Sequence, residues 1–584
     1  MKILLTTLNS KYIHTTLSLR YLYEYCKDDF SMEIKEYTIN HHTDYVLGEI
    51  YKGHYDLVCF SCYIWNIHNT LEIIRNLKKV RPDITIVLGG PEVSFDGKSL
   101  MEKEEQIDYI ICGEGEETFR ELLSFVVDKK GKKEEIKGIV YREDNKVYEN
   151  EARPLIQDLS IIPSPYSDGI LEDENKIIYY ESSRGCPHNC KYCLSSTIRG
   201  VRFFPIERVK KDLKLFLEKK VKQVKFVDRT FNVKKSHSFE IMKYICENDN
   251  GYTNFHFEIT ADLLDEETLR FLSTVREGLF QFEIGVQTTF DQTMKSIDRH
   301  VDFHVLSRIV KEISHFKNIH LHLDLIAGLP FESFERFKQS FDDVYALEPE
   351  KLQLGFLKLL KGSPIRKEKD LHEYVYREEA PYEVLQNKYI TYEEILKLKM
   401  IEEMVETFFN SHAFHHSVQY MINKFYNRPS QFYEEFAIFW EEKGYHHVSH
   451  GKNGLYEILI CFYKENQFVD EEIFMELLKF DYLMQGKGNL PHFFKKVDIP
   501  HFHERIHDFL HEEENINKYL PQYKNIPAKQ IIKKVSFHNF QYDIVKIIQN
   551  PLIKDIKKEK TTIFFDYELD HKVFEKARYE KIFI

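Results

Sequence analysis

The chain has 584 residues, of which 43% are hydrophobic and 30% charged, so its composition is that of a folded protein of several domains and not of a disordered chain. The formal net charge of −13 argues against a broad grip on nucleic acid, which needs a positive surface, although a structured RNA stays open as a substrate. No apolar run approaches the ~18 residues of a membrane span and the N-terminus does not resemble a signal peptide, so we expect no membrane partner.

The N-terminal part of the chain alternates short apolar segments with segments of helical periodicity. We expect strands at residues 2–7, 32–37, 57–61, 84–88 and 109–112, and helices between them, as at 16–25, 67–79 and 117–127. Buried strands that alternate with helices indicate a parallel sheet covered on both faces. Residues 1–150, which end in a hairpin over 138–150, therefore predict an α/β, doubly wound domain of the Rossmann-like, flavodoxin type that binds ligands beyond the carboxyl ends of its strands.

Prolines then mark a change in the chain, because Pro154, Pro163 and Pro165 restrict the backbone over a predicted linker at 151–175. A second alternating series follows over 176–365, with strands expected at 177–182, 224–227, 255–259, 280–286, 320–326 and 351–356. Six such units predict a partial (β/α)6 barrel with its chemistry at the C-terminal ends of the strands. Residues 366–584 predict a mostly helical domain that also holds strand-like pieces at 534–537 and 561–566.

Three of the nine cysteines, Cys186, Cys190 and Cys193, form a C-x3-C-x2-C cluster just after the first barrel strand. Soft thiolates select iron–sulfur clusters and zinc, and three ligands leave one iron of a four-iron cluster open for chemistry. A zinc knuckle completed by His188 is the alternative, but the usual pair of CxxC hairpins is missing. The odd cysteine number and irregular spacing favour a reducing compartment, so we expect a cytoplasmic protein.

With Tyr192 before the last cysteine, this motif resembles that of the radical S-adenosylmethionine (SAM) superfamily. Four later segments resemble motifs of its cobalamin-dependent branch: 226–231, 257–263, 283–288 and 324–330. The sequence departs from that branch at Arg229, where a second acid is usual, and at Gln287, which replaces a glutamate.

The resemblance implies a 4Fe-4S cluster held by Cys186, Cys190 and Cys193, and a SAM molecule whose reductive cleavage gives a 5′-deoxyadenosyl radical. It also implies that Tyr192, Gln287 and Leu329 bind SAM. The catalytic acids that it implies are Asp228 and Glu258. Alternatively, Asp228, Glu258 and Gln287 only satisfy hydrogen bonds at the top of the barrel.

Polar and glycine-rich loops follow four of the N-terminal strands. Their residues are Asn9; Ser61, Cys62 and Tyr63; Gly89, Gly90, Pro91 and Glu92; and Gly113, Glu114, Gly115 and Glu116. Glycines allow close backbone approach to a ligand, although plain turn chemistry is the alternative. The arrangement resembles the cobalamin-binding domain that precedes the barrel in one class of radical SAM enzymes. No complete D-x-H-x-x-G motif supplies a cobalt-binding histidine, and we expect His14 to be a local cap or loop residue.

The C-terminal region resembles an uncharacterised domain found in one subgroup of these proteins, and its many histidines favour solvated or core-edge positions over a metal site. The whole resemblance implies a cobalamin-dependent enzyme that methylates an unactivated carbon of a small molecule or peptide, with an electron donor such as flavodoxin or ferredoxin. Ring contraction, cyclisation or oxidation without methyl transfer stay open. A non-catalytic cobalamin sensor is a further alternative, which the cysteine cluster opposes.

Overall fold

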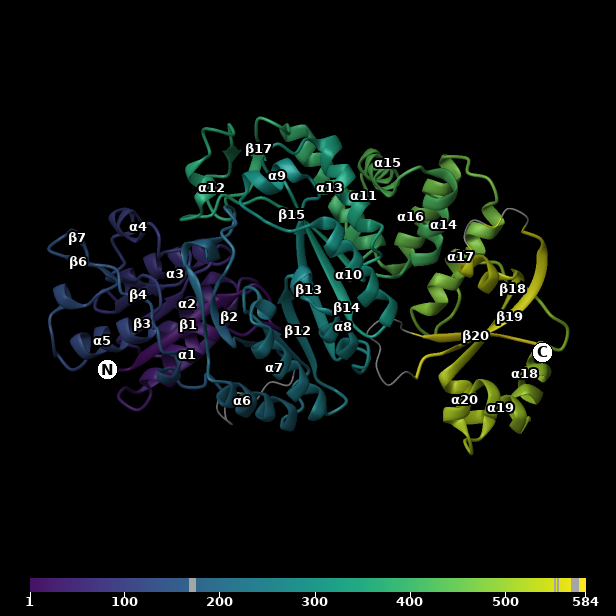
Figure 1. The fold of residues 1–584 in the computed structure, drawn as a ribbon, viewed down its shortest axis with the longest axis horizontal. Helices are drawn as coiled ribbons and strands as arrows, with labels where there is room; N and C mark the ends of the chain where they lie inside the picture. The colour runs from purple at the N-terminus through teal and green to yellow at the C-terminus, as the bar shows by residue number, and fades with distance from the viewer. Residues whose placement is uncertain (167–174, 551–552, 554–555, 569–576, 584) are drawn as a thin grey trace.

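The computed structural model describes residues 1–166, 175–550, 553, 556–568 and 577–583. Three regions follow one another along the longest axis, from the N-terminal sheet through a central parallel sheet to the C-terminal helices (Figure 1). The predicted fold class is confirmed. The domain boundaries at 150, 175 and 365 stay predictions. None of the helices in the described ranges is long and apolar enough to cross a bilayer.

The N-terminal sheet has the strand order β2-β1-β3-β4-β5-β6-β7, and its first five strands run parallel. The strands are β1 (Ile3–Asn9), β2 (Met32–Thr38), β3 (Leu57–Ser61), β4 (Thr85–Gly89), β5 (Tyr109–Ile111), β6 (Ile139–Glu143) and β7 (Lys146–Glu149). The helices are α1 (Leu17–Cys26), α2 (Thr43–Lys52), α3 (Ile67–Val80), α4 (Gly97–Lys103) and α5 (Glu116–Val126). The expected hairpin is confirmed as β6 and β7, which extend this sheet in antiparallel pairing.

Alternate residues of each N-terminal strand enter different cores. In β1, Leu4 and Leu8 belong to the core that includes α2 and α3, whereas Ile3 and Leu5 belong to the core that includes α1 and α5. Successive side chains of a strand point to opposite faces, so both faces of this sheet are covered. The carboxyl ends of its strands are left free to meet a ligand.

The central sheet has the order β15-β14-β13-β12-β11-β8, with all six strands parallel. Its strands are β8 (Ile178–Tyr180), β11 (Gln223–Phe226), β12 (Asn254–Ile259), β13 (Phe280–Gln287), β14 (His320–Ala327) and β15 (Lys351–Phe356). The helices are α6 (Ile206–Glu218), α7 (Lys235–Glu247), α8 (Glu266–Leu272), α9 (Asp291–Ser296), α10 (Phe303–Phe316) and α11 (Phe334–Tyr345). The first and last strands do not pair with one another, as a partial barrel requires.

The two faces of this central sheet differ in polarity. Along β13, the apolar Phe280 and Phe282 are buried in the core, while Gln281 and Glu283 between them are half-buried on the other face. The same alternation runs through β12 and β14. One face therefore packs on helices and the other forms a polar lumen.

A short hairpin carries the first cysteine, and the sequence did not predict it. Strands β9 (Ser183–Cys186) and β10 (Gly200–Phe203) pair antiparallel. Before it, the predicted linker is packed against the barrel core through Ile156, Leu159 and Tyr166. Residues 167–174 of that linker lie outside the described residues.

The C-terminal region is mostly helical, as predicted. A small segment with α12 (Pro364–Lys367), β16 (Val375–Tyr376) and β17 (Val384–Gln386) comes first. It is followed by α13 (Tyr392–Phe408), α14 (His415–Phe425), α15 (Pro429–Glu442), α16 (Lys452–Glu465), α17 (Glu471–Met484), α18 (Phe502–His511), α19 (Glu513–Tyr519), α20 (Ala528–Lys534) and α21 (Ile544–Gln549). The two expected strand pieces are parts of a three-stranded antiparallel sheet of β18 (Val535–Tyr542), β19 (Lys558–Asp566) and β20 (Arg578–Ile582).

Candidate functional site

A cavity of about 540 Å³ lies between the N-terminal domain and the barrel, a size typical of small-molecule and cofactor sites. It is placed where β1, β3, β4 and β5 end. Predicted site residues that line it are Asn9, Ser61, Tyr63, Gly89, Gly90, Gly113, Glu114, Gly115 and Glu116. The barrel contributes Tyr179, Glu181, Ser183, Arg184, Gly185, Ile198, Arg202, Val227 and Arg229. The two domains thus share one cavity.

Three predicted residues, Cys62, Pro91 and Glu92, lie outside the described lining of this cavity. The Cys62 side chain is fully buried in the core of the sheet. Its backbone explains Gly90, because a Cβ there would lie 2.6 Å from the Cys62 carbonyl oxygen and the φ of Gly90 is +107°. Glu92 is also buried, accepts a hydrogen bond from Tyr382 and pairs with Lys361 at 3.0 Å. Its contacts therefore tie the N-terminal domain to the segment around α12.

On the cavity wall, the predicted Tyr63 is joined by an aromatic side chain that the sequence analysis missed, Trp65. The rings of Tyr63 and Trp65 are stacked with centroids 4.4 Å apart, and Trp65 Nε1 donates to the Leu8 carbonyl. Both residues follow β3, and Trp65 is exposed despite its size. An exposed, fixed aromatic pair offers a flat apolar surface to a ligand. The only signal in the sequence was a tryptophan in a loop after a buried strand.

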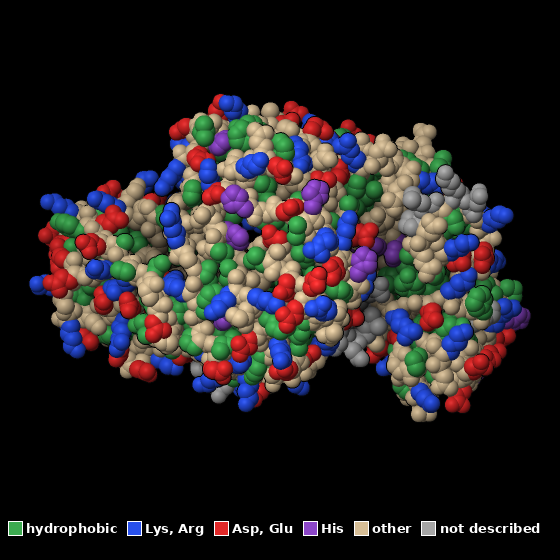
Figure 2. Space-filling view, viewed as in Figure 1, with side chains coloured by type: hydrophobic (Ala, Val, Ile, Leu, Met, Phe, Trp, Pro, Cys, Tyr) green, Lys and Arg blue, Asp and Glu red, His purple; other side chains and the backbone are tan. Residues whose placement is uncertain are grey.

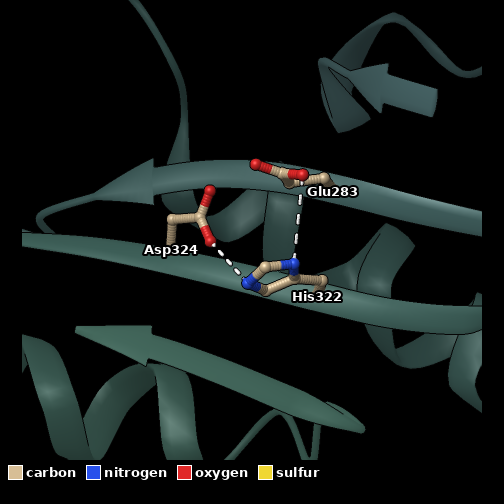
Figure 3. A group of neighbouring side chains, drawn as sticks. All are labelled: Glu283, His322 and Asp324. Atoms are coloured by element: carbon tan, nitrogen blue, oxygen red, sulfur yellow. Dashed lines mark ion pairs between the residues drawn. The ribbon is translucent and has the colours of Figure 1, made fainter. Parts of the chain in front are cut away.

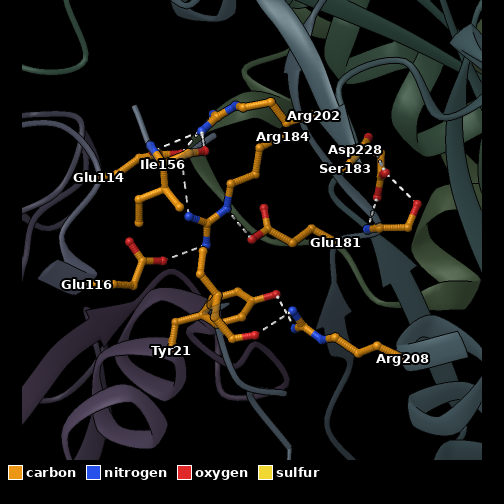
Figure 4. Close-up of polar contacts among 12 residues, drawn as sticks. Tyr21, Glu114, Glu116, Ile156, Glu181, Ser183, Arg184, Arg202, Arg208 and Asp228 are labelled. Carbon is orange, nitrogen blue, oxygen red and sulfur yellow. Dashed lines mark hydrogen bonds and ion pairs between the residues drawn. The ribbon is translucent and has the colours of Figure 1, made fainter. Parts of the chain in front are cut away.

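Charged side chains join the two domains at the cavity (Figure 4). Arg184 Nη2 donates to Glu116 Oε1 at 2.6 Å, and its Nε donates to Glu181 Oε1 at 2.7 Å. Arg202 holds both oxygens of Glu114, at 3.0 and 2.8 Å. Bidentate guanidinium–carboxylate pairs combine strength with fixed geometry. Glu114 and Glu116 therefore set the position of the cysteine loop relative to the N-terminal domain.

The lowered pKa of Glu114 shows that this network stabilises the charged form of the Glu114 side chain. Burial alone would raise the pKa of Glu114, but the hydrogen bond from Arg202 and the backbone N–H of Ile156 outweigh burial and lower it. Glu114 is therefore a carboxylate at neutral pH, and its oxygens are already occupied by protein donors. This supports a positioning role for Glu114 at the cavity more than direct contact with a ligand.

His14 lies in a loop on the cavity wall, and it reaches across the domain boundary. Its Nδ1 lies 2.7 Å from the hydroxyl of Tyr179 on β8. It does not cap α1, because the N-cap residue of that helix is Thr16. Burial and the positive charges of Lys11 and Lys225 lower the pKa of His14, so its ring is neutral at pH 7. A neutral imidazole is the form that can bind a metal.

The three cysteines lie at and just beyond the end of β9 in a single loop. The Cys193 N–H donates to the Cys190 carbonyl, and Cys193 Sγ accepts the N–H of Ser195 at 3.4 Å. Burial is the main cause of the raised pKa of Cys186, and the neighbouring thiols Cys193 and Cys190 also raise it. The three sulfurs therefore lie close enough to influence one another. All three are free of disulfides.

Arg299, which the sequence analysis missed, places a buried positive charge beside this loop. Its Nη1 donates to Cys190 Sγ at 3.5 Å and to the Tyr192 hydroxyl at 3.3 Å, while its Nη2 donates to the Gly285 carbonyl. Hydrogen bonds and charge near cluster sulfurs tune the reduction potential of iron–sulfur sites. No spacing rule links residue 299 to residue 190, so no sequence pattern indicated this contact.

Asp228 lies at the C-terminal end of β11 and holds the start of the cysteine loop. It accepts the N–H of Ser182 at 2.9 Å and the hydroxyls of Ser182 and Ser183 at 2.7 and 2.6 Å. Burial raises its pKa to about 6. Both oxygens are engaged by protein donors, so the contacts support a positioning role for this predicted catalytic residue.

Glu258 on β12 faces the lumen, and burial followed by the charge of Glu283 raises its pKa to about 7. Gln287 ends β13 with a φ of +71°, and its Oε1 is buried without a hydrogen-bond partner among the described residues. Strained backbone and unsatisfied polar atoms concentrate at functional sites, which supports a ligand role for Gln287. Tyr192 and the fully buried Leu329 instead pack in one apolar cluster behind the cysteine loop.

Comparison with known families divides the chain into three segments. Residues 3–123 match the B12 binding domain, residues 180–344 match the radical SAM superfamily, and residues 370–565 match a protein family of unknown function, DUF4080.

Among curated proteins, the chain is similar to the cobalamin-dependent radical SAM methyltransferase TokK of Streptomyces tokunonensis, with 24% identity over 336 residues that cover 55% of this chain and 49% of TokK. The chain spans about half the length of the curated relatives it matches.

Two solved structures share the fold. The cobalamin-dependent S-adenosylmethionine radical enzyme OxsB, with aqua-cobalamin and S-adenosylmethionine bound, has a TM-score of 0.58 at 15% identity, covering 82% of this chain and 78% of that chain. The radical SAM methyltransferase TsrM of Kitasatospora setae, with cobalamin and a [4Fe-4S] cluster bound, has a TM-score of 0.55 at 16% identity, covering 65% and 79%. The chain therefore carries a domain of the radical SAM superfamily, with a B12 binding domain before it and a DUF4080 domain after it.

Proposed function

We propose that this protein is a cobalamin-dependent radical SAM enzyme that cleaves SAM reductively at a 4Fe-4S cluster and methylates an unactivated carbon of a small-molecule or peptide substrate. One observation supports this most: the cavity of the N-terminal domain is also lined by Ser183, Arg184 and Gly185, which lead directly into Cys186. The strand that leads into the cysteine loop and the B12 binding domain thus line one shared cavity.

The cysteine loop fits a 4Fe-4S cluster, because three free thiols on one loop supply three ligands and leave one iron open. Cys186, Cys190 and Cys193 would hold it. When bound, the cluster supplies the electron that cleaves SAM to a 5′-deoxyadenosyl radical. Asp228 and Arg299 would keep the loop in place, while Gln287 and Glu258 offer polar groups to SAM or substrate on the lumen side.

The cavity also fits the ring of a large cofactor. Gly113 has a φ of +83°, and a Cβ there would enter open space, while the stacked Tyr63 and Trp65 supply an apolar wall. Asn9, Ser61, Tyr63, Gly89, Gly90, Gly113 and Gly115 would contact cobalamin, and Glu114 and Glu116 would fix its cavity to the barrel. When bound, cobalamin supplies a carrier for the methyl group. His14 lies on the cavity wall with a neutral ring, so it is the side chain to examine as a cobalt ligand.

Methyl transfer is proposed over ring contraction, cyclisation or oxidation because TokK and TsrM are both named as methyltransferases. The electron would come from a protein donor of the flavodoxin or ferredoxin type, and a cytoplasmic location fits the free cysteines. The C-terminal domain adds no residue to the described lining of the cavity.

Mass spectrometry of the SAM products tests the proposal. The full chain, loaded anaerobically with cluster and cobalamin and given a reductant, should release both 5′-deoxyadenosine and S-adenosylhomocysteine when candidate substrates are supplied. Deoxyadenosine without S-adenosylhomocysteine across those substrates would contradict methyl transfer and leave a non-methylating radical reaction. A chain that takes up cluster but shows no corrinoid absorption after loading would contradict the cobalamin part.

A further inference from the structure

The lumen of the barrel holds a second group of metal-ligating side chains, separate from the cysteines. Glu283 on β13 is the register partner of His322 on β14, and Asp324 follows two residues later on the same face (Figure 3). Each offers one ligand atom, and these atoms all lie within 4.8 Å of one another. The group lies below the top of the barrel, because β13 and β14 continue beyond it to Gln287 and Ala327.

His322 and Asp324 form a close pair of buried ligand atoms. Their Nε2 and Oδ1 lie 3.0 Å apart as an ion pair, and neither atom has a further hydrogen-bond partner among the described residues. His322 is only 8% exposed, so water cannot freely satisfy it. Two ligands that are each about 2.1 Å from one cation and at right angles to one another are about 3.0 Å apart. The spacing is therefore compatible with shared coordination of one cation.

The third residue, Glu283, is held by other side chains. Its Oε2 accepts from Lys225 Nζ and from His256 Nε2, each at 2.9 Å, whereas Oε1 has no hydrogen bond in the described part of the chain. Ligating carboxylates are commonly fixed in this way by a second set of donors. Lys225 pairs with Glu283 and neutralises its charge, so the negative charge of Asp324 is left for one further cation to balance.

From these contacts we propose that Glu283, His322 and Asp324 form a binding site for one divalent transition-metal ion, of the Mn²⁺, Fe²⁺ or Zn²⁺ class. A donor set of one imidazole and two carboxylates matches these ions, while Mg²⁺ and Ca²⁺ prefer oxygen donors alone. Three protein ligands leave coordination positions open for water or for an oxygen of a ligand in the lumen. The three side chains are 11 to 19% exposed. This proposal does not rest on the proposed radical chemistry.

The electrostatics agree with this geometry. Burial, opposed by His322 and assisted by the charge of Glu283, raises the pKa of Asp324. A divalent cation between these carboxylates would lower that pKa and favour the charged form.

The test uses Mn²⁺ as the probe and electron paramagnetic resonance of free Mn²⁺ as the readout, on the full cluster-loaded chain without SAM. The wild type should bind one Mn²⁺ in the lumen, and Zn²⁺ should displace it. His322→Ala and the nearly isosteric Asp324→Asn should each weaken that binding at least tenfold, while thermal unfolding verifies that both variants fold. The control is the double variant His507→Ala, His511→Ala, whose ring nitrogens lie 3.1 Å apart on the exposed surface of α18.

Each outcome decides the proposal. Binding that persists in the control and is lost in both lumen variants supports it. A wild type that binds no Mn²⁺, equal binding by Asp324→Asn and the wild type, or loss only in the α18 control would overturn it. Because SAM is absent and cysteines are unchanged, failure of this metal site leaves the proposed function untouched, and failure of SAM cleavage leaves the metal titration readable.

Discussion

Arg184 and Glu116 form an ion pair of 2.6 Å across the boundary between the N-terminal domain and the barrel, although they lie 68 residues apart in the chain. Arg184 lies two residues before Cys186. Both side chains are almost wholly buried. The pair therefore couples the loop that carries the cysteines to the helix that borders the cofactor cavity. Any loss of that pair leaves a buried charge beside both proposed cofactor sites.

We predict that Glu116→Gln destabilises the chain by about 1–3 kcal/mol and speeds loss of bound cobalamin, because a buried charge that loses one partner is costly. Arg184 keeps Glu181, which limits the loss. Thermal unfolding and corrinoid absorbance after gel filtration measure both effects. The control is Asp29→Asn, which breaks the half-exposed pair with Arg120 and should cost less than about 1 kcal/mol. Equal effects of the two variants would refute the coupling.

Arg299→Ala should make the cluster harder to reduce. Removal of a buried positive charge beside Cys190 disfavours the extra negative charge of the reduced cluster. We expect the midpoint potential to become more negative by tens of millivolts, where ~59 mV equals a tenfold change for one electron. A redox titration followed by electron paramagnetic resonance measures it. An unchanged or more positive potential would show that Arg299 acts only by packing.

Much of the fold follows from local patterns. The strands at 57–61 and 351–356 were predicted with the bounds that β3 and β15 have, because short apolar runs with clear polar flanks define a buried strand. The cysteine motif was equally local, since its three ligands lie within eight residues. Most residues of the predicted loops line the cavity because parallel strands bring their carboxyl ends to one edge, whereas Cys62, Pro91 and Glu92 do not.

Side-chain partners distant in the sequence could not be predicted in this way. Arg202 meets Glu114 of the other domain over 88 residues of sequence, and Arg299 meets Cys190 within the barrel over 109. Such pairs depend on how distant segments pack, which no periodicity encodes. The lumen group is different. Glu283, His322 and Asp324 stand, with other polar residues, at alternate positions of β13 and β14, and that polar alternation was a readable sign of a polar lumen.

Glu258 should give SAM cleavage a pH dependence. Its pKa of about 7, against an ordinary 4.5, makes the side chain neutral below pH 7 and charged above it. Because a carboxylate attracts the positive sulfonium of SAM, the KM for SAM should fall as the pH rises through 7, on the order of tenfold for one close ion pair. The same raised pKa favours folding below about pH 4.5, and that contribution is lost as the pH rises through 7.

Glu258→Gln, which is always neutral, should keep the high KM of the low-pH wild type at every pH. Initial rates of deoxyadenosine formation from pH 6 to 8.5 measure this. Glu267→Gln serves as the control, because its exposed carboxylate pairs with Lys235 at the surface and should leave the profile unchanged. A Glu258→Gln profile that still bends near pH 7 would assign the titration to another group.

Two substitutions of Asp228 separate positioning from catalysis. Asp228→Ala leaves the buried N–H of Ser182 without its acceptor and should cost about 1–3 kcal/mol or more, with poor cluster loading. Asp228→Asn keeps an acceptor oxygen and should retain most of the stability and iron content. Unfolding curves and iron analysis measure both. Full stability of the alanine variant would contradict the positioning role, and an asparagine variant that loads cluster but cleaves no SAM would indicate direct catalysis.

Radical SAM activity is measured most directly as the amount of 5′-deoxyadenosine that the reduced, cluster-loaded full chain forms from SAM. The wild type and Cys246→Ala, which changes a cysteine outside the motif, should both form deoxyadenosine, and Cys190→Ala should form none above background. Cleavage by Cys190→Ala at the wild-type rate would contradict the assignment of the cluster ligands. A wild type that binds four irons and still forms no deoxyadenosine would contradict the proposed radical SAM activity itself.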